Sequence, residues 1–235
     1  QGVGYIDGEY CAKQDLRLPV GDLGFLLSDM TYDAVHVHNG RFFRLEDHLD
    51  RWERSIGIRR FTTLPLERDG VREVLMECVR RSQLRDAMVY LVATRGAAAD
   101  GLKDLRSCDN KFMAWAVPYY GVIAPDRMES GVDIIVSSVQ RTPPEAIDPT
   151  VKNFARIDFA DALLEAYDRG CEHAVLLDRD HARAVVTAAQ STPAPRTAAT
   201  APRPSALSGT RDTIAQSWSR CASPIATFAS APPTW

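Results

Sequence analysis

Lys152 is the residue whose type and setting best suit covalent chemistry. It stands in the stretch Asp-Pro-Thr-Val-Lys-Asn-Phe, residues 148–154, after a proline-rich loop and before a segment with an apolar face. A lysine at such a junction can point into a cleft, where a desolvated amine is more readily neutral and can attack a carbonyl to form a Schiff base. The alternative is a solvated surface lysine, which local context alone favours because most lysines are exposed.

Arg51 lies at the border of the buried face of a predicted helix, and its guanidinium could bind a phosphate. An arginine there can present a bidentate fork to a phosphate. The alternative is a salt bridge to Asp47 or Asp50. Gly209 and Thr210 could add backbone N–H groups and a hydroxyl for an anion, although such pairs are also common caps and turns.

Aromatic and imidazole side chains supply further candidates. Tyr32 and Tyr90 could line a site, but a tyrosine is more often a core residue whose hydroxyl is satisfied. His36 and His38 are two apart on a predicted strand, so both face the same side. No third ligand is evident in the sequence, and hairpin histidines are usually structural, so we assign no metal.

The elements that would position these residues follow from apolar periodicity. Asn39-Gly40 between two β-prone runs is a strong hairpin signal. In the last predicted helix Tyr167 is expected to face inward, and Gly170 is placed to end the helix. These patterns predict an α+β fold without a regular βαβ alternation. The predicted segments are helices over residues 45–56, 71–79 and 159–167 and strands over residues 32–37, 41–43, 88–94, 112–117, 134–139 and 173–177.

Bulk properties exclude several classes of protein. The 235 residues carry a net charge of −3 with a pI near 6.0, which does not indicate a nucleic-acid or membrane-surface partner. No apolar run reaches the roughly 18 residues of a membrane span, and no signal-peptide pattern opens the chain. It begins with Gln1 rather than Met, which suggests a trimmed fragment. Five dispersed cysteines indicate reduced thiols, mostly core fillers, in a cytoplasmic protein.

Several motifs become meaningful when they are taken together. They are the stretches Gly24–Phe25, Ser28–Asp33, Asn39–Arg51, Thr94–Gly96, Arg141–Asn153 and Leu163–Gly170. This pattern, which covers roughly residues 1–178, resembles the class IV (fold type IV) pyridoxal-phosphate (PLP) aminotransferases. The (R)-selective amine transaminases and their D-amino-acid and branched-chain relatives look closest. The resemblance implies a homodimeric two-domain α/β protein, with an N-terminal α/β sandwich over 1–120 and a barrel-like cofactor-binding domain over 121–235.

The resemblance also implies an activity and roles for residues. Lys152 matches the lysine that forms a Schiff base with PLP and then moves a proton between the substrate α-carbon and cofactor C4′. The implied reaction is ping-pong transfer of an amino group from a D-amino acid, a branched-chain amino acid or an (R)-amine to a keto acid or ketone. An alternative is a lyase like aminodeoxychorismate lyase. The implied binding residues are Arg51, Gly209 and Thr210 for the cofactor phosphate and Tyr32, Met88 and Tyr90 for the substrate.

The C-terminal part departs from the family pattern. The family has a glutamate that pairs with the pyridine nitrogen of PLP, whereas no glutamate follows Glu172 here. Of the 48 residues 188–235, 33 are Ala, Pro, Ser or Thr, which is typical of a disordered or poorly packed tail. One hypothesis is that this tail is family sequence translated partly out of frame. These departures support another alternative function, a non-catalytic remnant that binds PLP weakly or serves only as a dimer partner.

Overall fold

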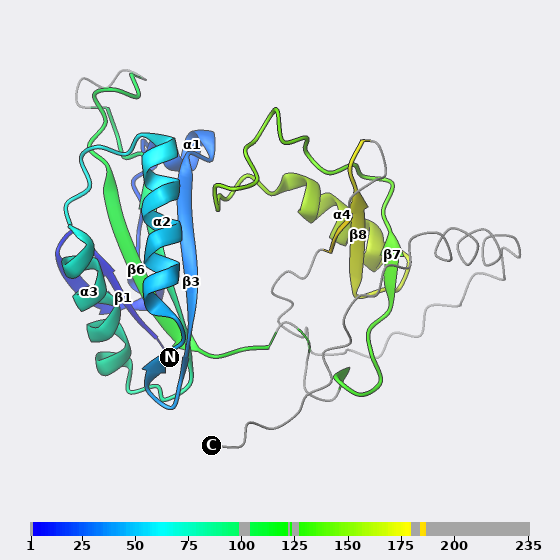
Figure 1. Ribbon diagram of the computed structural model, residues 1–235, viewed down its shortest axis with the longest axis horizontal. Helices are drawn as coiled ribbons and strands as arrows, with labels where there is room; N and C mark the ends of the chain where they lie inside the picture. Colours follow the sequence, from blue (N-terminus) through cyan, green and yellow to red (C-terminus); the bar gives the residue numbers. More distant parts are fainter. Residues whose placement is uncertain (1, 99–103, 122, 124–126, 180–183, 187–235) are drawn as a thin grey trace, which may run out of the picture. The chain divides into compact units, whose positions relative to one another are not determined.

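A computed structural model of the chain describes residues 2–98, 104–121, 123, 127–179 and 184–186 (Figure 1). The predicted phosphate ligands Gly209 and Thr210 lie outside these residues, as does the whole segment 188–235. The described part contains two sheets, and each is presented by itself below.

The first sheet has six strands, all paired antiparallel, in the order β2-β1-β6-β5-β3-β4. The predicted hairpin at Asn39-Gly40 is confirmed, and both residues have the positive φ that such a turn requires. The strands are β1 (Val3–Ile6), β2 (Glu9–Ala12), β3 (Met30–His38), β4 (Arg41–Phe42), β5 (Ala87–Thr94) and β6 (Lys111–Pro118).

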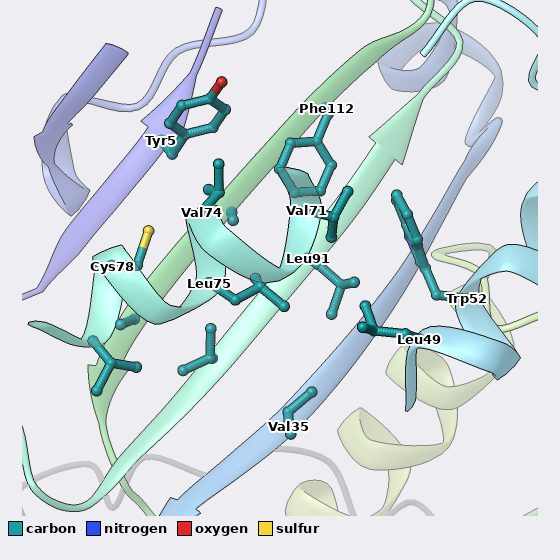
Figure 2. Packing of buried hydrophobic residues seen from close by; sticks show 14 of the residues in the cluster. Tyr5, Val35, Leu49, Trp52, Val71, Val74, Leu75, Cys78, Leu91 and Phe112 are labelled. Carbon is teal, nitrogen blue, oxygen red and sulfur yellow. The ribbon is translucent and has the colours of Figure 1, made fainter. Parts of the chain in front are cut away.

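Helices cover one face of this sheet (Figure 1). A 3₁₀ turn, η1 (Lys13–Asp15), and the short helix α1 (Leu23–Leu27) are followed by the two long helices α2 (Leu45–Arg59) and α3 (Arg68–Ser82). The predicted apolar faces of both long helices are confirmed, since their buried residues include Leu49 and Trp52 on α2 and Leu75 on α3. Figure 2 shows these side chains packed over Val35 and Leu91 of the sheet.

The opposite face of the sheet carries a different, aromatic cluster. Side chains alternate along each strand, so Val35 and Val37 of β3 belong to the helix-covered core while Tyr32 faces the other way. Tyr32, Tyr90 and Val92 are buried at the centre of this second cluster. The partly buried residues packed against them are Met30, Ala34, Met88, Met113, Trp115, Val117, Tyr120 and Phe154.

The second sheet has the order β7-β8-β9, with β7 (Ile134–Val136) parallel to β8 (His173–Leu177) and β9 (Ala184–Val186) antiparallel to it. The predicted strand over 134–139 is therefore shorter than expected. Helix α4 (Ile157–Asp168) lies between β7 and β8 in the chain and makes one βαβ unit. The α+β expectation is confirmed.

Helix α4 packs through small side chains. Phe159, Ala162 and Ala166 are buried with residues of β8, and Gly170 follows the helix with a φ of +72°. The prediction that Tyr167 faces inward is wrong, because that side chain is 50% exposed. Positions 159, 162 and 166 already complete one face, and residue 167 lies about 100° further around the helix. No helix within the described ranges is long and apolar enough to cross a bilayer.

Candidate active site

The backbone at Lys152 is attached to the open edge of β3. Strand β3 pairs with β5 on one side, whereas β4 covers its other side only at Val37 and His38. At the uncovered end, the Lys152 carbonyl accepts hydrogen bonds from the Tyr32 N–H, at 3.0 Å, and from the Thr31 hydroxyl, at 2.7 Å. A β-bridge joins Thr31 to Asn153. These bonds fix where the lysine leaves the main chain.

The Lys152 side chain turns onto the aromatic face of the sheet. Its Nζ lies 4.8 Å from the centroid of the Tyr32 ring, and that ring stacks on Phe154 at 4.3 Å. Among the described residues, no carboxylate forms a salt bridge with this amine. Within the described ranges, the half-buried lysine is therefore held by a cation–π contact and main-chain bonds rather than by a carboxylate.

The predicted substrate residues Tyr32, Met88 and Tyr90 belong to this same aromatic cluster. Tyr90 stacks on Trp115 at 4.9 Å with an interplanar angle of 13°, and its hydroxyl is hydrogen-bonded to that of Tyr120. Burial, followed by the hydrogen bond to Tyr120, raises the pKa of Tyr90. The phenol thus stays neutral at physiological pH. The structure gathers these three residues in one cluster, of which Tyr32 contacts Lys152, and their roles stay predictions.

Arg51 lies on α2 and reaches a buried carboxylate on β3. Its Nε and Nη2 donate to the two oxygens of Asp33 at 2.7 and 2.8 Å, and Nδ1 of His48 lies 2.9 Å from the same carboxylate. The expected alternative partners, Asp47 and Asp50, pair instead with other arginines. The alternative prediction that Arg51 forms a salt bridge is thus confirmed, but the predicted partners were wrong.

The charges around Asp33 are balanced while part of Arg51 stays available. Burial raises the pKa of Asp33, but the hydrogen bonds from His48 and Arg51 outweigh burial and hold that pKa below its ordinary value. The bond with Asp33 in turn raises the pKa of Arg51. The Arg51 side chain is 40% exposed, and its Nη1 has no hydrogen bond within the described part of the chain. A second anion could bind there.

The Thr94-Arg95-Gly96 motif has a structural role in the described part of the chain. Arg95 is buried, binds Asp29 through Nε at 2.6 Å, and donates to the carbonyls of Arg59 and Arg60 at the end of α2. Gly96 has a φ of +76°, and a Cβ there would lie 1.7 Å from the Asp109 carbonyl oxygen. This motif therefore joins the end of β5 to α2.

The two histidines of β3 acquire a third neighbour in the fold. One potential ligand atom each from His36, His38 and Asp86 lie within 4.8 Å of one another. Both ring nitrogens of His38 already have partners, Asp86 at 2.7 Å and the Asn39 amide at 3.0 Å, and His36 stacks on Tyr119. These contacts account for the histidines as supports of the hairpin, and we assign no metal to them.

One residue beside Lys152 escaped the sequence analysis. Arg156 donates from Nη1 to the Tyr32 hydroxyl at 3.0 Å, and its guanidinium lies 4.5 Å from the Phe159 ring centroid. The available signal was its spacing, four residues after Lys152, but only the fold reveals the contact with Tyr32. Phe154, which stacks on Tyr32, likewise had no predicted role.

Comparison with known proteins identifies the family. Residues 30–193 match the amino-transferase class IV family. The chain therefore belongs to that family, as the motifs predicted. A putative branched-chain-amino-acid aminotransferase of Methanocaldococcus jannaschii is 31% identical over 178 residues, which are 74% of this chain and 59% of that protein. The D-alanine aminotransferase of Listeria monocytogenes is 28% identical over 91 residues, 39% of this chain and 31% of that protein.

Solved structures show the same fold. A branched-chain amino acid aminotransferase designated T.th., with pyridoxamine 5′-phosphate, matches with a TM-score of 0.68 at 22% identity, over 76% of this chain and 60% of that one. The enzyme from Thermoproteus uzoniensis, with norvaline, matches with a TM-score of 0.66 at 20% identity over the same shares. The chain thus spans about three fifths of the length of these proteins.

Proposed function

We propose that this chain is a PLP-dependent transaminase in which Lys152 carries the cofactor. The observation that supports the proposal most is the setting of Lys152. Its backbone is bonded to β3, and its amine has no carboxylate partner among the described residues and lies against the Tyr32 ring. A lysine needed only for stability would more often be exposed or paired. The family of the chain and the pyridoxamine 5′-phosphate in a structure of the same fold add support.

The residues fit the chemical groups of PLP. The cofactor presents an aldehyde, an aromatic ring and a phosphate. Lys152 offers a primary amine for the aldehyde, and the Tyr32–Phe154 stack offers an apolar wall. Arg51 keeps donors for the phosphate after it has bound Asp33, and we propose that Gly209 and Thr210 join it.

Each residue then has a defined task. PLP supplies the electron sink when it is bound. Lys152 would hold the cofactor and afterwards move a proton at the α-carbon of the substrate. Asp33 orients Arg51 through two hydrogen bonds, and Tyr32, Met88 and Tyr90 shape the substrate pocket. The neutral Tyr90 phenol brings no charge into that pocket.

The proposed substrates follow from the relatives. A branched-chain or D-amino acid, or an (R)-amine, would donate its amino group, and a keto acid or ketone would accept it. The proposal includes a homodimer, as the family resemblance implies, and a cytoplasmic location, as the dispersed cysteines indicate. The absence of a glutamate after Glu172 favours one competing candidate, a remnant that binds PLP without turning over substrate.

An absorbance titration of the full chain with PLP tests the proposal. We expect wild type to develop a band near the visible edge that Lys152→Ala lacks. Lys111→Ala is the matched control, since Lys111 forms an ion pair with Asp7 at 2.8 Å, and it should keep the band. A D-amino acid, a branched-chain amino acid and (R)-1-phenylethylamine are then added one at a time. The compound that acts as the amino donor should remove the band.

Three results would contradict the proposal. Identical free-PLP spectra for wild type and Lys152→Ala would show that Lys152 does not carry the cofactor. A lysine-dependent band that no donor discharges would favour the remnant. A product formed by elimination, with no amino group transferred to an acceptor, would instead identify a lyase.

A further inference from the structure

Arg156 contacts Tyr32 from the residue that precedes α4. In the described part of the chain it forms no salt bridge, and its contacts are the Tyr32 hydroxyl at 3.0 Å and the face of Phe159. By contrast, Arg51 is paired with Asp33, and Arg95 is paired with Asp29. An exposed arginine held by a hydroxyl and a ring, with free donors, is suited to bind an external anion.

The position of Arg156 indicates which anion it would bind. Lys152 and Arg156 contact the same phenol: the amine lies over the ring, and the guanidinium binds the hydroxyl. An amino acid or keto acid carries its carboxylate one bond away from the carbon that reacts. A carboxylate at Arg156 would therefore leave that carbon near Lys152.

Arg106 is another exposed arginine, but it is less suited to bind a substrate carboxylate. Arg106 lies just after the loop that follows β5, but its guanidinium is already paired with Asp104 at 2.7 Å and is 90% exposed. Arg106 and Arg156 thus form a natural comparison. Both are exposed arginines, and only one has its charge compensated within the described residues.

We propose that Arg156, together with the Tyr32 hydroxyl, is the subsite for the carboxylate of amino-acid and keto-acid substrates. This inference rests on the proposed function and narrows it. A site built to bind a carboxylate discriminates strongly against an analogue that lacks one, because the guanidinium then stays without its anion. The chain should accordingly prefer amino acids to simple (R)-amines such as 1-phenylethylamine.

The test uses the PLP-loaded full chain and two probes of the same shape. 4-Methylvaleric acid, the ligand in another structure of the T.th. enzyme, carries a carboxylate, and 4-methylvaleramide is its neutral counterpart. Calorimetry should show that Arg156→Gln weakens binding of the acid at least tenfold while leaving the amide unchanged. Arg156→Lys should recover part of the loss, and Arg106→Gln should bind both probes like wild type.

Three outcomes would overturn the inference. Unchanged affinity of Arg156→Gln for the acid, with a normal lysine-dependent absorbance band, would refute the carboxylate subsite and leave the transaminase proposal intact. Weaker PLP binding with unchanged acid binding would assign Arg156 to the cofactor phosphate. A wild-type chain without the band would refute the proposed function, and the subsite with it.

Discussion

Positively charged side chains have different partners on the two faces of the six-stranded sheet. On the helix-covered side, Arg51 and Arg95 are each bonded to a buried carboxylate, Asp33 and Asp29. On the aromatic side, Lys152 contacts the Tyr32 ring, and within the described residues it has no carboxylate partner. Because side chains alternate along β3, adjacent residues of one strand serve both arrangements.

This difference distinguishes cations that stabilise the fold from cations that can bind or react with a ligand. A cation that is paired with a buried carboxylate stabilises the fold, and breaking such a pair is costly. A cation left without an anion contributes little to stability but can bind or react with a ligand. Substitution on the helix-covered side should therefore change mainly stability, except at Arg51, whose remaining donors we propose for the cofactor phosphate. Substitution on the aromatic side should change mainly ligand binding.

Gly96→Ala should give the largest loss of stability. The positive φ of Gly96 and the contact of a new Cβ with the Asp109 carbonyl oxygen should lower the free energy of unfolding by about 3 kcal/mol or more. Urea denaturation measures the change. Gly57→Ala is the control, because Gly57 is helical and a Cβ there meets nothing, so it should be slightly stabilising. Equal effects of the two substitutions would contradict the assigned role of Gly96.

Asp33→Asn should give the second-largest loss of stability, and this loss should depend on pH. The two hydrogen bonds that Asp33 accepts from the charged Arg51 side chain imply a loss of about 2 kcal/mol at pH 7. Since the folded-state pKa of Asp33 is lowered, its contribution is fully present above the unfolded pKa of about 3.9 and disappears as the pH falls through the folded value. Urea titrations should thus show the difference between wild type and variant shrinking below about pH 4. A constant difference would contradict the ion pair.

Tyr32→Phe should have the smallest effect, and on binding rather than stability. The ring that faces Lys152 is kept, but Arg156 loses its hydroxyl partner. We expect binding of 4-methylvaleric acid to weaken about fivefold, which corresponds to about 1 kcal/mol for one hydrogen bond, with an unchanged PLP absorbance band. Tyr167→Phe, at an exposed position, should match wild type. Loss of the band in Tyr32→Phe would show that the hydroxyl supports the cofactor instead.

Local patterns predicted much of the fold. The Asn39-Gly40 hairpin and the apolar face of α2 could be read from spacing alone. The hairpin of β1 and β2 was missed even though Asp7-Gly8 gives the same kind of signal and also has positive φ values. Tyr167 was misplaced because two adjacent positions of a helix compete for one narrow buried face.

The site was less predictable because its contacts join distant segments. The family motifs indicated Lys152, Tyr32 and Tyr90, and the fold places Lys152 against Tyr32, which shares a buried cluster with Tyr90. Asp33 was missed as the partner of Arg51, since acidic residues on the same helix looked nearer in sequence. The bond between Arg156 and Tyr32 joins β3 to the start of α4, and no local spacing reports such a contact.

The most direct test of the account identifies the lysine that bonds to PLP. The chain has only four lysines, Lys13, Lys103, Lys111 and Lys152, so reduction of the PLP-loaded protein with borohydride followed by peptide mass analysis distinguishes them all. We predict one reduced cofactor per chain, on the peptide that contains Lys152, and none in Lys152→Ala. Labelling spread over the other lysines, or no labelling at all, would contradict the central claim.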